Sequence, residues 1–109
     1  MAYKKVSIAR RFVKFEKFGD YVEGYLDRIE KSKIFDREVE RGVLIDDDNN
    51  ELYLPSNFQI TEFCKKMLSE GFKLCKVKIV YVGNEKTRLG RGVKVYEFYI
   101  DTETRKALN

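Results

Sequence analysis

The sequence contains no histidine, one proline and two cysteines. Without histidine, the chain lacks the usual acid–base catalyst at neutral pH and the usual companion of cysteine in a zinc site. Cys64 and Cys75 lie eleven positions apart and form no C-x-x-C pair, which predicts two buried, reduced thiols in a cytoplasmic protein. One proline and seven glycines leave no room for a long linker in 109 residues. We therefore expect a single domain.

Several functional motifs are also missing. Long apolar runs and a charged-then-apolar leader are absent, so we expect no membrane segment and no export. The G-x-S-x-G elbow and the Gly-Lys-Ser/Thr of a P-loop do not occur. The stretch DDDNNE places Glu51 where a calcium loop needs glycine, and the Glu-x-Lys of a metal-dependent nuclease is replaced by ELY. The sequence predicts a protein that is not an enzyme and needs no cofactor or metal.

Charge is distributed unevenly along a chain whose net charge is +4. Residues 36–51 are mostly acidic, whereas the loop GNEKTRLGR at residues 83–91 is basic. Residues 1–17 contain Glu16 as their single acidic residue, and their cationic residues are Lys4, Lys5, Arg10, Arg11, Lys14 and Lys17. A polyanion held by the two basic segments and repelled by the acidic one would explain this pattern. Chance clustering on a soluble surface is the alternative.

The hydrophobic pattern predicts five strands and one helix. Apolar alternation marks strands over residues 21–35, 39–46, 51–54, 73–82 and 93–101, and Gly24 suggests a bend or bulge in the first. The helix begins at Ser56, which forms a capping box with Gln59, and it ends at Gly71. Its apolar stripe consists of Ile60, Phe63, Cys64, Met67 and Leu68. This order predicts a mainly β fold, a five-stranded OB-fold Greek-key barrel with one helix between strands 3 and 4. A two-layer α+β sheet is the alternative.

A basic loop and spare aromatic rings point to a binding function. The connection between the last two strands contains Lys86, Arg88 and Arg91, with Lys94 just beyond. Such cations neutralise phosphates whatever the base sequence. Single strands also need flat stacking surfaces, for which we select Tyr25, Phe35 and Tyr53. These seven residues form the predicted DNA-binding site, and ordinary packing under a loop is the alternative for each ring.

The phrases FGDYVEGYLDRIEKSK, ELYLPSN and VKIVYVGNEKT followed by LGRGVKVYEFYID resemble a family of small phage-type OB-fold proteins that bind single-stranded DNA. The resemblance covers roughly residues 12–103, and its motifs are structural. It implies sequence-independent binding of single-stranded DNA during phage replication or recombination, without a cofactor. It also supports Lys86 and Lys94 as DNA contacts.

From these observations we divide the chain into a basic N-terminal arm at residues 1–18, an OB-fold nucleic-acid-binding domain at 19–103 and a short C-terminal tail at 104–109. Wrapping DNA, pairing with a second subunit and covering a sheet edge are three roles open to the arm. The expected partner is single-stranded DNA, with RNA as an alternative, together with replication or recombination proteins. The tail DTETRKALN is not acidic, which makes recruitment through the tail doubtful. A protein-interaction adaptor or inhibitor on the same barrel is the alternative function.

Overall fold

The computed structural model describes residues 10–86 and 92–106. Strands make up 58% of it, so the fold is mainly β. The strands are β1 (Arg10–Phe12), β2 (Tyr21–Ile34), β3 (Arg37–Ile45), β4 (Glu51–Tyr53), β5 (Cys75–Lys86) and β6 (Gly92–Arg105), and the helix is α1 (Phe58–Ser69).

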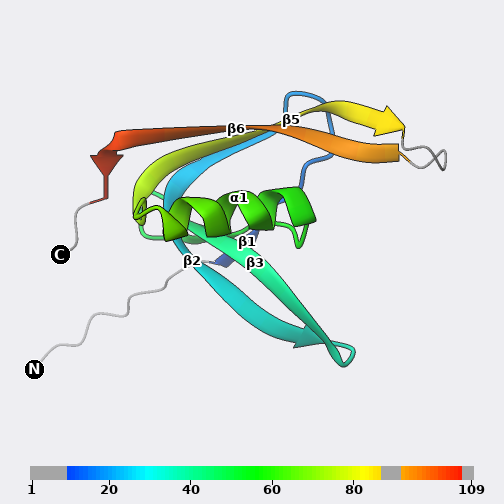
Figure 1. Ribbon diagram of the computed structural model, residues 1–109, viewed down its shortest axis with the longest axis horizontal. Coiled ribbons are helices and arrows are strands. Elements are labelled where there is room, and N and C mark those ends of the chain that lie inside the picture. The colour runs from blue at the N-terminus through cyan, green and yellow to red at the C-terminus, as the bar shows by residue number, and fades with distance from the viewer. Residues whose placement is uncertain (1–9, 87–91, 107–109) are drawn as a thin grey trace, which may run out of the picture.

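The strands form one curled sheet in the order β1-β4-β3-β2-β5-β6. The neighbours β5, β2, β3 and β4 have the Greek-key arrangement, because three consecutive strands lie side by side and the fourth returns to pair with the first. The return passes through α1, which lies against the concave face of the sheet between the β2–β3 and β5–β6 hairpins (Figure 1). The result is a half-barrel filled by a helix.

The described part of the chain contains six strands, whereas the sequence predicted five. The five expected strands correspond to β2 to β6, with the helix between the third and fourth of them as predicted. The additional strand β1 lies in the segment assigned to the basic arm, and it pairs in parallel with β4 at the edge of the sheet. Its sequence, RRF, contains one apolar residue and therefore shows no alternation that would predict a strand.

The curvature of the sheet comes from irregularities in two long strands. The register of β2 against β3 shifts between Leu26 and Arg28, and that of β5 against β6 shifts between Tyr81 and Gly83. Bulges of this kind bend a strand and increase its twist. The bend that was expected at Gly24 therefore falls after Leu26. Gly24 instead permits a close approach, because a Cβ there would lie 2.9 Å from the Cβ of Leu44.

The N-cap of the helix lies one residue later than predicted. Asn57 is the N-cap, and its side-chain oxygen accepts a hydrogen bond of 3.2 Å from the backbone N–H of Ile60. Ser56 lies outside this cap, so the predicted capping box is wrong. Asn57 takes its place and pairs with a backbone N–H of the first helical turn that has no partner within the helix. The predicted stop is confirmed, since Gly71 has a φ of +89° just after the helix.

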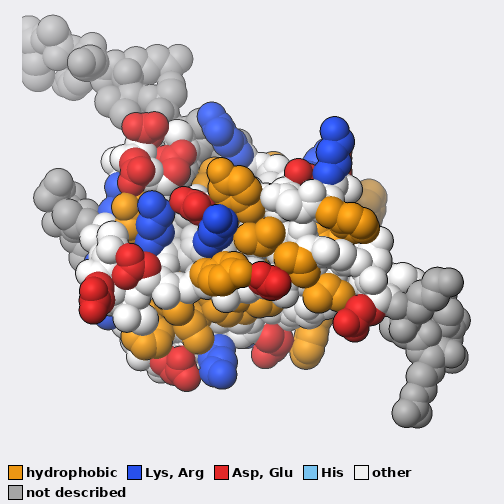
Figure 2. All heavy atoms as spheres, turned by 90° about the horizontal axis from the view of Figure 1, so that it is seen from above, with side chains coloured by type: hydrophobic (Ala, Val, Ile, Leu, Met, Phe, Trp, Pro, Cys, Tyr) orange, Lys and Arg blue, Asp and Glu red, His pale blue; other side chains and the backbone are white. Residues whose placement is uncertain are grey.

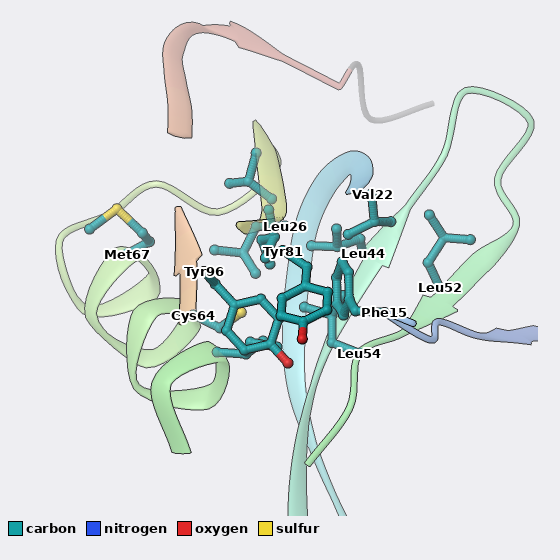
Figure 3. Close-up of a cluster of buried hydrophobic side chains, with 13 residues drawn as sticks. Phe15, Val22, Leu26, Leu44, Leu52, Leu54, Cys64, Met67, Tyr81 and Tyr96 are labelled. Carbon is teal, nitrogen blue, oxygen red and sulfur yellow. The ribbon is translucent and has the colours of Figure 1, made fainter. Parts of the chain in front are cut away.

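The hydrophobic core lies between α1 and the concave face of the sheet. Leu26, Leu44 and Ile79 from three neighbouring strands are fully buried there. Figure 3 shows the rings of Tyr81 and Tyr96 within the same cluster. The two cysteines are free and buried, as predicted, and burial raises the pKa of the Cys64 thiol to about 12.

Gly42 of β3 is packed tightly against Cys64 of α1 and against Leu54. A Cβ at this position would lie 2.6 Å from Sγ of Cys64 and 3.1 Å from Cδ1 of Leu54. We expect Gly42→Ala to lower the free energy of unfolding by about 1–3 kcal/mol through overpacking, as measured by urea denaturation. Gly83→Ala is the matched control, because a Cβ there meets nothing within 4 Å, and it should change stability by no more than about 0.5 kcal/mol. Equal losses from both substitutions would contradict this account.

Candidate nucleic-acid interface

A groove of about 550 Å³ lies where four separate parts of the chain meet. Its walls are residues 12–16, Arg41 of β3, residues 55–57 before α1, and Lys94 and Tyr96 of β6. Residues 55–57 lead into the N-terminal end of α1, and both long hairpins project past this end of the helix (Figure 1). The groove therefore lies at the open mouth of the half-barrel.

Residues 13–20, here called the N-terminal strap, connect β1 to β2 across this mouth. The backbone N–H of Val13 donates to the carbonyl of Tyr53 at 2.8 Å, and that of Gly19 donates to the carbonyl of Tyr81 at 2.7 Å. Between these points, the buried ring of Phe15 meets Tyr96 edge to face at 5.3 Å. The strap is thus fixed to β4 at one end, to β5 at the other and to β6 in between.

Asp20 organises the strap internally. Its carboxylate accepts hydrogen bonds of 2.9 Å from the backbone N–H groups of Lys17 and Glu16. These two bonds stabilise the charged form, so they hold the pKa of Asp20 below its ordinary value. Asp20 is therefore ionised at neutral pH, and its charge is committed to the backbone of the strap.

The groove contains more positive than negative charge. Lys14, Arg41 and Lys94 line it together with the single carboxylate of Glu16. The Lys94 ammonium donates a hydrogen bond of 2.7 Å to the carbonyl of Phe15, which leaves further N–H groups on the same nitrogen. An anion entering the groove would meet three cations within one concave surface.

Exposed aromatic rings accompany these cations. Phe12 is 63% exposed, although it stacks on Tyr53 at 5.3 Å and the Arg41 guanidinium lies 5.4 Å from its centroid. Phe18 of the strap is 68% exposed, and Phe58 at the start of α1 is 80% exposed. Large apolar side chains in contact with water are a feature of binding surfaces when they gather near one another.

One of the residues predicted from the sequence lines this groove, and a second lies behind Phe12 of its lining. Lys94 is part of its lining, as described above. Tyr53 points toward the convex face of the sheet as expected, but it is only 5% exposed because Phe12 of β1 covers it. Its hydroxyl donates to Glu51 at 2.6 Å, which raises the pKa of Tyr53. Phe12 is therefore the ring that meets solvent at this position.

The other predicted rings lie away from the groove. Tyr25 is half-buried on the convex face, and its hydroxyl donates to Asp47 at 3.0 Å, a bond that raises the pKa of Tyr25. Phe35 is 97% exposed at the tip of the β2–β3 hairpin. Both Phe35 and Asp36 have positive φ values, 50° and 63°. A bulky residue in this left-handed region is strained. Exposure of the whole ring to water is a further unfavourable contribution to the free energy of folding.

The predicted basic loop is only partly described. Lys86 ends β5 and pairs in register with Gly92 of β6. Its side chain, and the whole of Arg88 and Arg91, lie outside the described residues. The hairpin that presents this loop is present as predicted, since β5 and β6 pair along almost their entire length.

Sequence reasoning missed Phe12 and Arg41, which line the groove, and the exposed rings of Phe18 and Phe58 in the segments that adjoin it. The basic character of residues 1–17 was recognised, and Lys14 belongs to that segment. What the sequence did not reveal is that β1 attaches to β4, which brings Lys14 to the same groove as Lys94. The only available hint was the phrase FVKF, in which two rings flank a lysine.

Comparisons with protein-family models, with curated proteins and with solved structures give no match to this chain. Within residues 10–86 and 92–106, no group of three or more His, Cys, Asp or Glu side chains is arranged to hold a metal ion. In the same part of the chain, α1 is too short and too polar to span a membrane. The interface is therefore interpreted from its own geometry.

The strained hairpin tip gives a stability prediction. Asparagine and glycine favour the positive φ values that Phe35 and Asp36 adopt. The double substitution Phe35→Asn with Asp36→Gly should raise the free energy of unfolding, by about 1 kcal/mol or more, in urea denaturation. A matched change on the same arm, Ser32→Asn, leaves the turn intact and should have no such effect. If the double substitution destabilises the protein, the ring of Phe35 makes a stabilising contact that outweighs its backbone strain.

Proposed function

We propose that this chain is a sequence-independent single-stranded DNA-binding protein of the OB type. The observation that carries the proposal is the groove at the mouth of the half-barrel, where Lys14, Arg41 and Lys94 face one carboxylate. Phosphates bind to these cations, and bases stack on the exposed phenylalanines beside them. Both interactions are available to every nucleotide, so the base sequence has little influence.

The strand order supports the OB assignment. An OB-fold is a partly open Greek-key barrel, and its nucleic-acid surface lies between the loop that joins strands 1 and 2 and the loop that joins strands 4 and 5. The corresponding loops here are the β2–β3 tip and the β5–β6 tip. The described parts of both hairpins project past the N-terminal end of α1 (Figure 1), which is the end at which the groove lies. Lys86, Arg88 and Arg91 then supply a second set of phosphate contacts from the β5–β6 tip.

The biological role follows from the sequence resemblance described above. A small protein that binds single strands without sequence preference coats and protects them, and we propose that it does so in phage DNA replication or recombination. The N-terminal segment has a defined place in this proposal. Residues 12–16 contribute one wall of the binding groove, and β1 covers the edge of β4.

The first test measures binding and its salt dependence. Fluorescence anisotropy of a labelled oligo-dT of about 20 nucleotides should show binding at low salt that weakens as salt rises. Lys14→Ala and Arg41→Ala should each weaken binding similarly for every base sequence. Each should also reduce the slope of log K against log salt by about 0.7, the value for one single-strand phosphate.

Lys73→Ala is the control for these variants. Lys73 is exposed and follows the opposite end of α1, so its loss should leave affinity and slope nearly unchanged. Absence of binding to oligo-dT at low salt would refute the proposal. Equal affinity for a duplex of matching length would replace it with general DNA binding, and preference for oligo-rU would assign RNA as the ligand.

A second test isolates stacking. Phe58→Ala removes an 80% exposed ring from the first helical position, where alanine is a better helix former than phenylalanine. We expect stability to be retained and affinity for oligo-dT to fall by about 1–3 kcal/mol, the contribution of one stacked base. The salt slope should not change, because no charge is lost. Phe58→Tyr should bind like the wild-type protein.

A further inference from the structure

A second aromatic surface lies on the convex face of the sheet, which the helix does not cover. Figure 2 looks onto the side of the molecule where β5 and β6 lie in Figure 1, and it shows hydrophobic side chains gathered across the face with charged ones among them. Two tyrosines here are largely exposed, Tyr21 at 60% and Tyr99 at 51%. The proposed function uses neither of them.

The register of three strands fixes the arrangement of this surface. Glu23 of β2, Lys78 of β5 and Tyr99 of β6 form one cross-strand row, and Tyr21 lies two residues from Glu23 along β2. The strand spacing and rise then place Tyr21 and Tyr99 about 12 Å apart, with Lys78 between them. The ammonium of Lys78 lies 4.8 Å from the ring centroid of Tyr21.

A shallow hollow of about 310 Å³ lies beside Tyr99, and Tyr21 is not part of its lining. Lys76, Lys78 and Tyr99 line it, and so do the carboxylates of Glu23 and Asp101. Asp101 is occupied by its own strand, because it accepts hydrogen bonds from the backbone N–H of Glu103 at 3.0 Å and from the Thr104 hydroxyl at 2.8 Å. The Glu23 carboxylate lies 3.8 Å from the ammonium of Lys76 and 3.7 Å from that of Lys78.

The surface is continuous with the groove through the N-terminal strap. Phe15 of the strap packs inside the mouth, and Phe18 is 68% exposed at its rim. Gly19 and Asp20 then join the strap to β5, through the 2.7 Å bond of Gly19 and a bond of 2.9 Å from Tyr81 N–H to the Asp20 carbonyl. The next residue is Tyr21. The strap therefore leads over the rim from the groove to the convex face.

We infer that a bound single strand continues from the groove over the rim at Phe18 and onto the convex face. There it stacks one base on Tyr21 and one on Tyr99, and Lys78 binds the phosphate between them. This inference rests on the proposed function. The occupant is single-stranded nucleic acid because a cation between two exposed rings matches the alternation of phosphate and base. In the bound state, the phosphate replaces Glu23 as the partner of Lys78.

The test compares short and long oligonucleotides. Known single-strand sites on one OB-fold span about 4–16 nucleotides, so labelled oligo-dT of about 5 nucleotides fills the groove alone and one of about 20 reaches both surfaces. Tyr21→Val and Tyr99→Val keep residues that suit a strand. Each should weaken binding of the long oligonucleotide by about 5- to 150-fold, the equivalent of one stacked base, and leave the short one unchanged. Tyr99→Phe retains the ring and should bind normally.

Substitutions of the charged residues change the affinity and its salt dependence in ways that a purely structural role of these residues would not produce. Lys78→Gln should weaken binding of the long oligonucleotide and reduce its salt slope. Glu23→Gln should have the opposite effect on affinity, because it removes the carboxylate that competes with phosphate for Lys78. Circular dichroism of each variant checks that the sheet is retained.

The outcomes separate this inference from the proposed function. If the tyrosine variants bind both lengths like the wild-type protein while Lys14→Ala and Arg41→Ala weaken binding, the extension is wrong and the groove stands. If the tyrosine variants weaken the short and long oligonucleotides equally, the convex face is a primary site, and its role as an extension is refuted. If the wild-type protein binds neither oligonucleotide, the proposed function itself fails.

Discussion

The attachment of residues 10–16 to the far edges of the sheet is the constraint on which the rest of the structure depends. β1 pairs with β4, and the Lys94 ammonium of β6 holds the carbonyl of Phe15. A curled sheet with two free edges would leave Tyr53 and the interior of the mouth open to water. With the segment in place, Phe12 covers Tyr53 from outside and Phe15 fills the mouth from inside. The same few residues supply the positive wall of the groove.

Much of the fold could be predicted from local patterns. Alternating side chains located β2 to β6, and the stripe at Ile60, Cys64 and Met67 located α1. The predictions that were wrong concern the N-cap and the position of the bulge, which depend on neighbouring residues and strands. Asn57 and Ser56 are both good caps, and the sequence does not reveal which one the helix uses. The bulge after Leu26 likewise depends on pairing with β3, which a single strand does not encode.

The candidate site was harder to predict because it is assembled from distant segments. Charge located the two basic regions, but Lys14 and Lys94 lie 80 positions apart, and no local pattern indicates that they share a groove. The burial of individual side chains was equally difficult to predict from the sequence. Tyr53 occupies the expected face of its strand, yet a ring from β1 covers it. Phe35 keeps a large exposed area because it lies at a hairpin tip, and Tyr99 does so because it lies on the convex face that the helix does not cover.

The bond between Lys94 and Phe15 joins residues 79 positions apart, and this separation has a consequence for synthesis. The strap leaves the ribosome well before β6, because the other described strands and α1 lie between them in the chain. Contacts of such long range form late in folding, because the entropy of closing the intervening loop must first be overcome. A nascent chain therefore exposes its basic N-terminal segment without a completed groove. Docking of β6 completes the groove, so the groove is assembled only after β6 has been made.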